Sequence, residues 1–184
     1  MTIHAEETIQ PEETIKKDIR ALFESGMKAF ADNAYEESET YFTRVLETSP
    51  EFRLAWESRG AARLRLQRTE AAIADFERAI ALSPERSRPY HLRGLAYEQK
   101  GDLNQAINDF NQAILLEPEY VAAYHSRSIL RSRRGETERA EKDLQTFKML
   151  TEKKLETFSN EHNIWRSAHL AVEDAGATDV LVDR

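Results

Sequence analysis

Hydrophobic side chains recur at the spacing of amphipathic helices along most of the chain. In residues 87–120, Tyr90, Gly94 and Tyr97 follow one another at steps of three and four. After Gly101-Asp102 the same spacing returns in a second group, Ala106, Ile107, Phe110, Ala113 and Ile114. Residues three and four apart lie on one face of a helix. This stretch therefore predicts two amphipathic helices joined by a tight turn, with Pro118 ending the second.

Proline and glycine repeat along the chain with one shared period of 34 residues. The repeated prolines are Pro50, Pro84 and Pro118, and the repeated glycines are Gly26, Gly60 and Gly94. At this period the chain divides into four units, residues 19–52, 53–86, 87–120 and 121–154. Residues 72–84 align with residues 106–118 without gaps. A fixed period of this length is typical of stacked helix-turn-helix units.

The repeated glycine lies in the middle of the first predicted helix of a unit, where it needs a physical reason. Glycine there costs about 1 kcal/mol of helix propensity relative to alanine. Close approach of the second helix supplies a reason, because a side chain would hold the helices apart. The small residues expected to face this gap are Ser38, Ala72, Ala106 and Ala140. The larger residues expected to fill the space between the helices are Phe42, Phe76, Phe110 and Leu144.

With these residues the chain resembles the tetratricopeptide repeat (TPR) family, whose 34-residue unit carries W-x2-L-G-x2-Y, A-x3-F and a closing P. The second unit matches this pattern at Trp56, Gly60, Ala72, Phe76 and Pro84. The outer units match less well, because Leu22, Ser128 and Glu152 replace the aromatic residue, the glycine and the proline. The resemblance implies an all-α fold, a right-handed superhelical solenoid of four TPR units within residues 17–154, followed by a capping helix.

Three units depart from the family pattern by carrying arginine in place of leucine. These residues are Arg59, Arg93 and Arg127, and an aspartate follows each one sixteen residues later: Asp75, Asp109 and Asp143. The first unit has Ser25 and Tyr41 at these places and lacks both charges. The arginine and the aspartate occur together in three units and are both absent from the first. This pattern predicts a bidentate ion pair between the two helices of a unit. An arginine row that binds acidic ligands is the alternative.

The two ends of the chain differ from the repeats. Residues 1–16, rich in Glu and Thr, are expected to be a disordered acidic tail. The fourth unit lacks its proline, so its second helix is expected to run on past residue 154, with a break at Ser159-Asn160. Residues 155–175 are expected to cap the stack, and residues 176–184 to be a flexible tail. Alternatively, Ile164 and Trp165 lie in a dimer interface.

The family resemblance implies that the first helices of the units line the inside of a curved groove. At the ninth place of each unit stand Met27, Ala61, Leu95 and Ile129, an apolar row. Beside it we expect apolar side chains and charged or titratable ones: Phe23, Phe30, Leu54, Leu64, Leu92, Glu57, Arg65, Arg88, His91, Glu98, His125 and Arg133. Packing between neighbouring first helices is the alternative for about half of these residues. An apolar groove with a polar rim is suited to a peptide segment or an amphipathic helix of a partner protein.

Composition narrows the class of protein further. The chain of 184 residues has a net charge of −7 and no cysteine, which excludes a disulfide framework and cysteine-ligated metals. The acidic balance argues against nucleic acid as the main partner, because phosphate binding needs clustered Lys and Arg. No apolar run reaches the length of a membrane span, and the start does not resemble a signal peptide. A cytoplasmic protein is expected.

Three more specific chemistries can be tested on the sequence. In TPR proteins that hold the acidic C-termini of chaperones, the resemblance implies a carboxylate clamp of Lys, Asn and Arg. The matching places here hold Phe23, Met27, Ser58, Arg88 and Leu92, and only Arg88 fits.

No phosphate-binding loop or hydrolase motif is present. His91 and His125 share one place in adjacent units, but a metal site would need further ligands. We expect no enzymatic activity, no metal and no cofactor.

Two hypotheses about function follow. The first is an adaptor or scaffold that binds a peptide or helix of a partner protein in the groove. The second is a structural protein that associates with itself, as a homodimer or larger assembly, through its C-terminal helix or the end of its solenoid.

Overall fold

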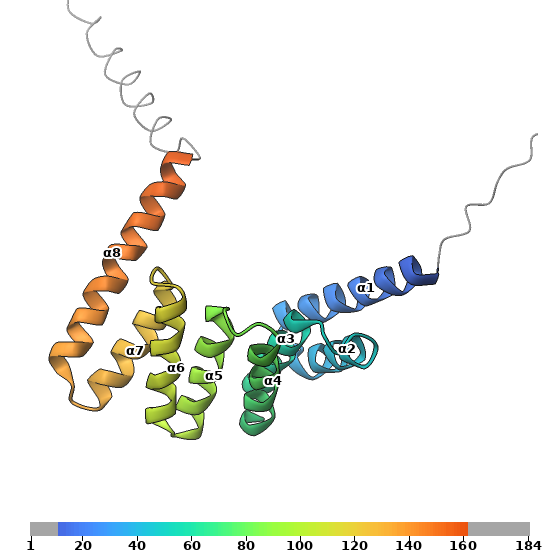
Figure 1. The fold of residues 1–184 in the computed structure, drawn as a ribbon, viewed down its shortest axis with the longest axis horizontal. Coiled ribbons are helices and arrows are strands. Elements are labelled where there is room, and N and C mark those ends of the chain that lie inside the picture. Colours follow the sequence, from blue (N-terminus) through green and yellow to red (C-terminus); the bar gives the residue numbers. More distant parts are fainter. Residues whose placement is uncertain (1–10, 162–184) are drawn as a thin grey trace, which may run out of the picture.

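The computed structural model describes residues 11–161, and this part of the chain is helical apart from short turns (Figure 1). The helices are α1 (Pro11–Ala31), α2 (Tyr35–Thr48), α3 (Arg53–Arg65), α4 (Thr69–Leu82), α5 (Ser87–Lys100), α6 (Leu103–Leu116), α7 (Val121–Arg133) and α8 (Thr137–Glu161). They pair as α1–α2, α3–α4, α5–α6 and α7–α8, and the pairs stack in chain order. The predicted all-α TPR solenoid is confirmed.

The turn inside each helix pair contains one residue with positive φ. These residues are Asn33, Gln67, Gly101 and Gly135, with φ of 61, 59, 89 and 75°, and they recur at the period of the repeat. After Gly101, the Asp102 N–H donates to the Tyr97 carbonyl at 2.9 Å, which closes the end of α5. Glycine adopts this conformation without steric cost, so the predicted turns at Gly101 and Gly135 are confirmed.

A phenylalanine ring on the second helix fills the centre of each of the first three units. Phe42, Phe76 and Phe110 are fully buried. A Cβ atom built on Gly94 would lie 2.5 Å from the Phe110 ring, and the distances at the two other glycines are 2.6 and 2.7 Å. These glycines therefore make room for an aromatic ring.

The fourth unit lacks this arrangement. Ser128 stands where the other units have glycine, and Leu144 is 38% exposed. The prediction that Leu144 fills the space between its helices is wrong. The Ser128 side chain takes the space that glycine leaves open in the other units. Within the described residues, no further unit covers Leu144.

The three predicted ion pairs form inside their units. Arg59, Arg93 and Arg127 each donate two hydrogen bonds to their aspartate, at distances between 2.6 and 3.0 Å. Asp75, Asp109 and Asp143 are 2, 6 and 4% exposed. The hydrogen bonds to Asp109 raise the pKa of the Arg93 guanidinium. The bidentate pairing is confirmed.

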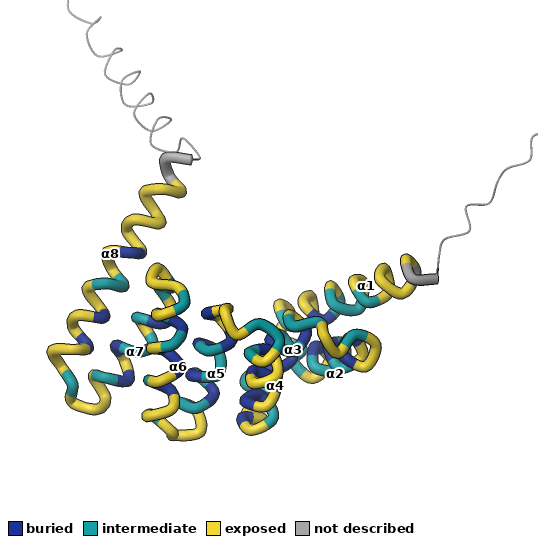
Figure 2. The backbone as a smooth tube through the Cα atoms, in the orientation of Figure 1, coloured by how far each residue is buried: buried dark blue, intermediate teal, exposed yellow. Residues whose placement is uncertain are grey.

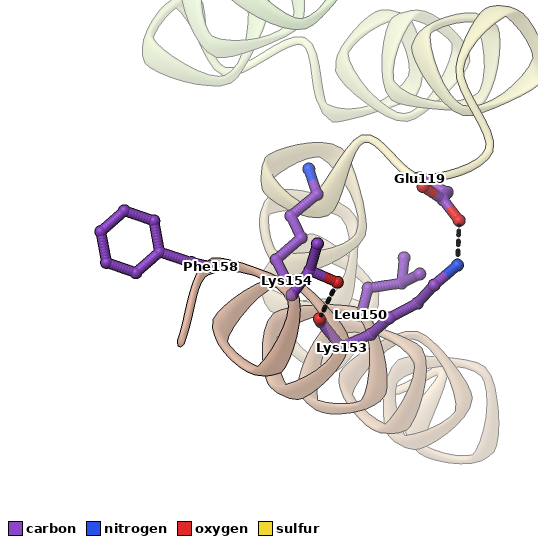
Figure 3. A pocket seen from close by; sticks show the side chains of 6 residues that line it. Glu119, Leu150, Lys153, Lys154 and Phe158 are labelled. Carbon is purple, nitrogen blue, oxygen red and sulfur yellow. Dashed lines mark hydrogen bonds and ion pairs between the residues drawn. The ribbon is translucent and has the colours of Figure 1, made fainter. Parts of the chain in front are cut away.

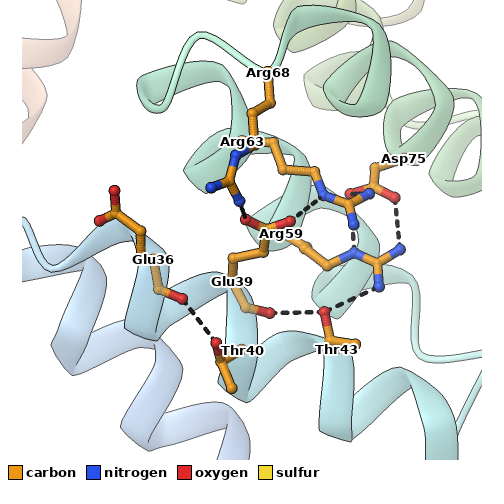
Figure 4. Close-up of polar contacts among 8 residues, drawn as sticks. All are labelled: Glu36, Glu39, Thr40, Thr43, Arg59, Arg63, Arg68 and Asp75. Atoms are coloured by element: carbon orange, nitrogen blue, oxygen red, sulfur yellow. Dashed lines mark hydrogen bonds and ion pairs between the residues drawn. The ribbon is translucent and has the colours of Figure 1, made fainter.

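Two of these arginines also join one unit to the next. Arg59 donates to the Thr43 hydroxyl on α2 at 3.2 Å, and Arg127 donates to the Asn111 side-chain oxygen on α6 at 2.7 Å. In the first of these interfaces Arg63 adds a bond to Asp75 at 2.9 Å and one to Glu39 on α2 at 2.7 Å (Figure 4). One charged cluster thus fixes both the helix pair and its position on the preceding unit.

Both ends of the described chain correct the sequence analysis. Residues 11–16, expected to belong to the tail, form the start of α1, because proline is favoured at the first position of a helix. Helix α8 runs through Ser159 and Asn160 without the expected break, since serine and asparagine cost little in a helix that no proline interrupts. Residues 155–161 therefore continue α8. Residues 1–10 and 162–184, with Ile164, Trp165 and the predicted C-terminal tail, lie outside the described residues.

We predict that Gly94→Ala destabilises the fold by about 1–3 kcal/mol, the usual cost of overpacking, although alanine gains about 1 kcal/mol in helix propensity. Urea unfolding followed by circular dichroism measures the change. The matched variant is Gly94→Ala with Phe110→Leu, which resembles the fourth unit and makes room for the new methyl group. A double variant whose loss equals the sum of the two single losses would contradict this explanation.

We predict that Asp109→Ala costs about 1.5–3 kcal/mol, because it leaves the half-buried Arg93 guanidinium without its hydrogen-bonded partner. Changing Arg93→Leu in the same chain restores the family pattern and should recover most of the loss. Thermal unfolding of the single and double variants tests this. Glu138→Ala, which removes the exposed partner of Lys142, is the control and should have little effect. A double variant no more stable than Asp109→Ala argues against the pairing.

Candidate functional site

The first helices of the units lie on the inner side of the solenoid. Helix α1 contacts α3, α3 contacts α5, and α5 contacts α7. Within the described residues none of the second helices contacts another second helix. The first helices are therefore closer together, as expected on the concave side of a curved stack. The surface formed by α1, α3, α5 and α7 is here called the inner surface.

The sixteen predicted groove residues divide by exposure into three groups (Figure 2). Seven are exposed: Met27, Leu54, Arg65, Arg88, His125, Ile129 and Arg133. Seven are half-buried: Phe23, Phe30, Ala61, Leu64, Leu92, Leu95 and Glu98. Two are buried, Glu57 and His91. The ninth places thus include two well-exposed apolar side chains, Met27 at 45% and Ile129 at 43%.

Several of the half-buried residues belong to the packed core more than to an open surface. Leu64 and Leu92 pack against the cluster that contains Phe76, and Leu95 packs against the cluster that contains Phe110. Phe23 packs on Phe42 and Phe52, with ring centroids 5.4 and 5.0 Å apart. These residues form the walls between units.

Glu57 is buried, which corrects the prediction that it lies on the polar rim of the groove. It is 1% exposed and accepts hydrogen bonds from Arg53 of its own helix and from Arg88 of α5, the latter at 3.4 Å. The sequence does not reveal the contact with Arg88, because Glu57 and Arg88 lie on different units. A hollow of 390 Å³ opens beside these three residues, at the start of α3 and α5.

His91 is also buried, although the sequence places it beside the apolar row of the groove. It is 7% exposed, and its ring lies 5.5 Å from Phe110 and 5.3 Å from Tyr120. Its Nε2 is 3.0 Å from the Ser126 hydroxyl, and its Nδ1 is 3.4 Å from the Tyr120 hydroxyl. Burial, assisted by the charge of Arg88, lowers the pKa of His91 to about 4. At neutral pH its imidazole is therefore uncharged and serves as a packing and hydrogen-bonding group.

The remaining charged groups of the inner surface are partly engaged with the protein itself. Arg133 donates to Glu98 at 2.7 Å, which joins α7 to α5. Arg65 lies over the Tyr35 ring, 4.5 Å from its centroid. His125 lies beside Phe147 of α8, with ring centroids 4.8 Å apart.

Comparison with known proteins agrees with this geometry, which defines a solenoid of helix pairs with an inner surface formed by the first helices. One tetratricopeptide repeat family model matches residues 23–87 and a second matches residues 87–120, together more than half of the chain. The chain belongs to the tetratricopeptide repeat family. No curated protein matches it significantly.

Solved structures share the fold at low sequence identity. The crystal structure of MamA is 22% identical, with a TM-score of 0.69 over 79% of this chain and 86% of that one. The first TPR domain of Spaghetti (RPAP3), bound to the HSP90 peptide SRMEEVD, is 24% identical, with a TM-score of 0.62 over 65% and 94% of the two chains. The second TPR domain of human RPAP3, in complex with the HSP70 peptide SGPTIEEVD, is 28% identical, with a TM-score of 0.61 over 64% and 98%.

Metal-ligand clusters and membrane-spanning helices are both absent from the described part of the chain. Residues 11–161 contain no group of three or more His, Asp or Glu side chains placed to hold a metal ion. None of the described helices is long and apolar enough to cross a membrane.

We predict that burial of His91 makes the stability of the protein depend on pH between about 4 and 6.5. The folded pKa lies below the unfolded one, so the unfolded chain takes up a proton first and stability falls as the pH is lowered through this range. The slope attributable to one such group approaches about 1.4 kcal/mol per pH unit. Denaturant unfolding at a series of pH values, compared between wild type and His91→Gln, measures this contribution. His125→Gln, at the equivalent but exposed place, is the control, and an equal change of slope in both variants would contradict the assignment.

Proposed function

We propose that the protein is a binding adaptor whose inner surface holds an extended or helical peptide segment of a partner protein. The observation that carries this proposal is the exposure of Met27, Leu54 and Ile129 on the first helices of three different units. Ala61 and Leu95, half-buried, continue the row between Met27 and Ile129. Exposed apolar side chains that recur along one concave surface provide successive contacts for one ligand.

The length of the inner surface sets the size of the ligand. Three steps between units, at about 10 Å for neighbouring helices, give a groove of about 30 Å. Such a groove fits roughly nine residues of extended peptide or a helix of about 20 residues. The two RPAP3 domains bound to heat-shock peptides support a peptide ligand for a solenoid of this shape.

The chemistry of the inner surface favours a different peptide from those two. Phe23, Met27 and Ser58 stand where the resemblance to chaperone-binding members implies lysine and asparagine. Of the charges beside the row, Arg88 is paired with Glu57 and Arg133 with Glu98. Both arginines have an acidic partner within the protein, although Arg88 shares Glu57 with Arg53. Apolar contacts are therefore expected to contribute most of the binding. We therefore propose a ligand that presents several apolar side chains and no obligatory terminal carboxylate.

A selected peptide tests this proposal whatever the natural partner is. Peptides of about 16 residues are selected from a displayed random library on the immobilised full chain and labelled for fluorescence anisotropy. We predict that Met27→Glu with Ile129→Glu weakens their binding at least about tenfold, because each buried apolar contact contributes on the order of 1 kcal/mol or more. Increasing the salt concentration should change the affinity little.

The control for this experiment is Leu115→Glu, which places the same charge on α6, outside the inner surface, at a leucine that is 73% exposed. It should leave the affinity unchanged. Peptides that bind all three proteins equally would refute binding at the inner surface.

A further inference from the structure

One face of α8 is open although the equivalent faces of the earlier second helices are covered. Val45 and Leu46 of α2 are buried and cluster with Ala55 of the next unit. The residues at these two places in α8 are Phe147, which is half-buried, and Lys148, which is exposed. A hollow of 420 Å³ lies along this face, lined by Ile129 and Leu144 among others. The last unit thus presents a surface that the other units bury against a neighbouring helix.

Helix α8 extends this open face well beyond the stack. It has 25 residues, whereas α2, α4 and α6 have 14. Its second half extends past the N-terminal end of α7 (Figure 1), and there Leu155 is 62% and Phe158 50% exposed. Phe158 extends away from the ion pair of Lys153 and Glu119 (Figure 3).

The apolar residues of this face form one continuous stripe. At 3.6 residues per turn, Leu144, Phe147, Thr151, Leu155 and Phe158 fall within an arc of roughly 80° around the helix axis. These five residues are here called the α8 stripe. It covers residues 144–158, about 21 Å along the helix.

The order of residues in the α8 stripe is symmetric about its centre. Leu144 and Phe158 are each seven residues from Thr151, and Phe147 and Leu155 are each four residues from it. Two such helices packed antiparallel about a two-fold axis at Thr151 would bring Leu144 against Phe158 of the second copy, and Phe147 against Leu155 of the second copy. An interface between identical copies has this self-complementary form.

Charge supports the same arrangement. Lys148 and Glu152 lie one turn apart on one flank of the α8 stripe, on either side of Thr151. A two-fold axis at Thr151 brings this flank of one copy beside the same flank of the other. Each lysine then faces a glutamate of the second copy, and flanking charges of this kind select partner and orientation in paired helices.

The other end of the solenoid does not fit the α8 stripe. A second copy added head to tail would place its α1 there, as α3, α5 and α7 are placed on the preceding units. Within α1, Lys28 stands where α3 has the buried Ala62, and Ser25 stands where α3 has Arg59. Lys28 is exposed and would be buried by such a contact without a matching charge in the stripe. The α8 stripe therefore suits another α8 better than it suits α1.

We propose that the α8 stripe is a homodimer interface, in which α8 packs antiparallel on α8 of a second copy around a two-fold axis at Thr151. This makes the self-association hypothesis specific to described residues. The interface borders the inner surface at the last unit, where Ile129 lies beside Leu144 and His125 beside Phe147. The inner surfaces of α1, α3 and α5 would remain open to partners in both copies.

The sequence has no cysteine, so single introduced cysteines test the axis directly. Thr151→Cys places one thiol on the proposed axis, where it meets its own symmetry mate. The matched control is Met149→Cys, two residues away, 58% exposed and on nearly the opposite side of α8. Both full-length variants are oxidised mildly at the same concentration and analysed on non-reducing gels. We expect mostly linked dimer for Thr151→Cys and mostly monomer for Met149→Cys.

The orientation has its own test. In the antiparallel dimer, Phe147→Cys and Leu155→Cys should each link poorly alone and well when the two variants are mixed. A parallel pair would link each variant with itself and would overturn the proposed arrangement.

Light scattering with size exclusion measures the dimer without any crosslink. We expect wild type to run at twice 21.2 kDa and to shift to the monomer with Leu155→Glu, whereas Leu115→Glu stays dimeric. Wild type that is monomeric at tens of micromolar, or equal linking of the two cysteine variants, overturns the proposal. If residues 162–184 or a foreign protein cover the α8 stripe instead, the purified wild type is expected to be monomeric, which is the result that overturns the proposal. Leu155→Glu should retain peptide binding at the inner surface, so failure here is distinguishable from failure of the adaptor proposal.

Discussion

The contact between a phenylalanine ring and a glycine sets the spacing on which the first three units depend. Phe42, Phe76 and Phe110 are fully buried, and each ring occupies the space that a Cβ on its glycine would need. The ring and the glycine act together. The two helices of a unit can approach this closely only where the second helix carries the ring and the first helix carries no side chain. With three identical spacings the units stack regularly, and the first helices of neighbouring units come into contact on one side only.

Polar interactions then determine how one unit is placed on the next. The Arg59 guanidinium binds Asp75 inside its unit with two of its nitrogens and reaches Thr43 of the preceding unit with the third. Arg127 does the same with Asp143 and Asn111. A planar group with several fixed donors suits this double role. Because both partners are largely buried, the arrangement contributes more to geometry than to net stability.

The sequence predicts well whatever repeats with the period of the chain. Helix pairs, turns and arginine–aspartate pairs recur at fixed spacing, so each copy supports the interpretation of the others. It predicts poorly what depends on a neighbour from another unit. Glu57 and His91 occupy places that face inward, yet Arg88 of α5 covers the first, and Tyr120 and Ser126 enclose the second. No spacing within a unit reveals these partners. The continuation of α8 through Ser159 was missed for a related reason, since residues favoured at helix caps do not by themselves end a helix.

The departures of the fourth unit from the repeat act together. Ser128 takes the place of glycine, and Leu144 remains partly exposed where the earlier units bury phenylalanine. The missing proline leaves α8 free to continue through Glu152 to Glu161, which carries Leu155 and Phe158 beyond the N-terminal end of α7. Each change alone would only weaken a repeat. In the other units the corresponding surface joins one unit to the next. In the fourth unit the combined changes turn it into an extended apolar stripe, and the residues of this stripe follow the same order in both directions. A stripe of that kind is best matched by a copy of itself.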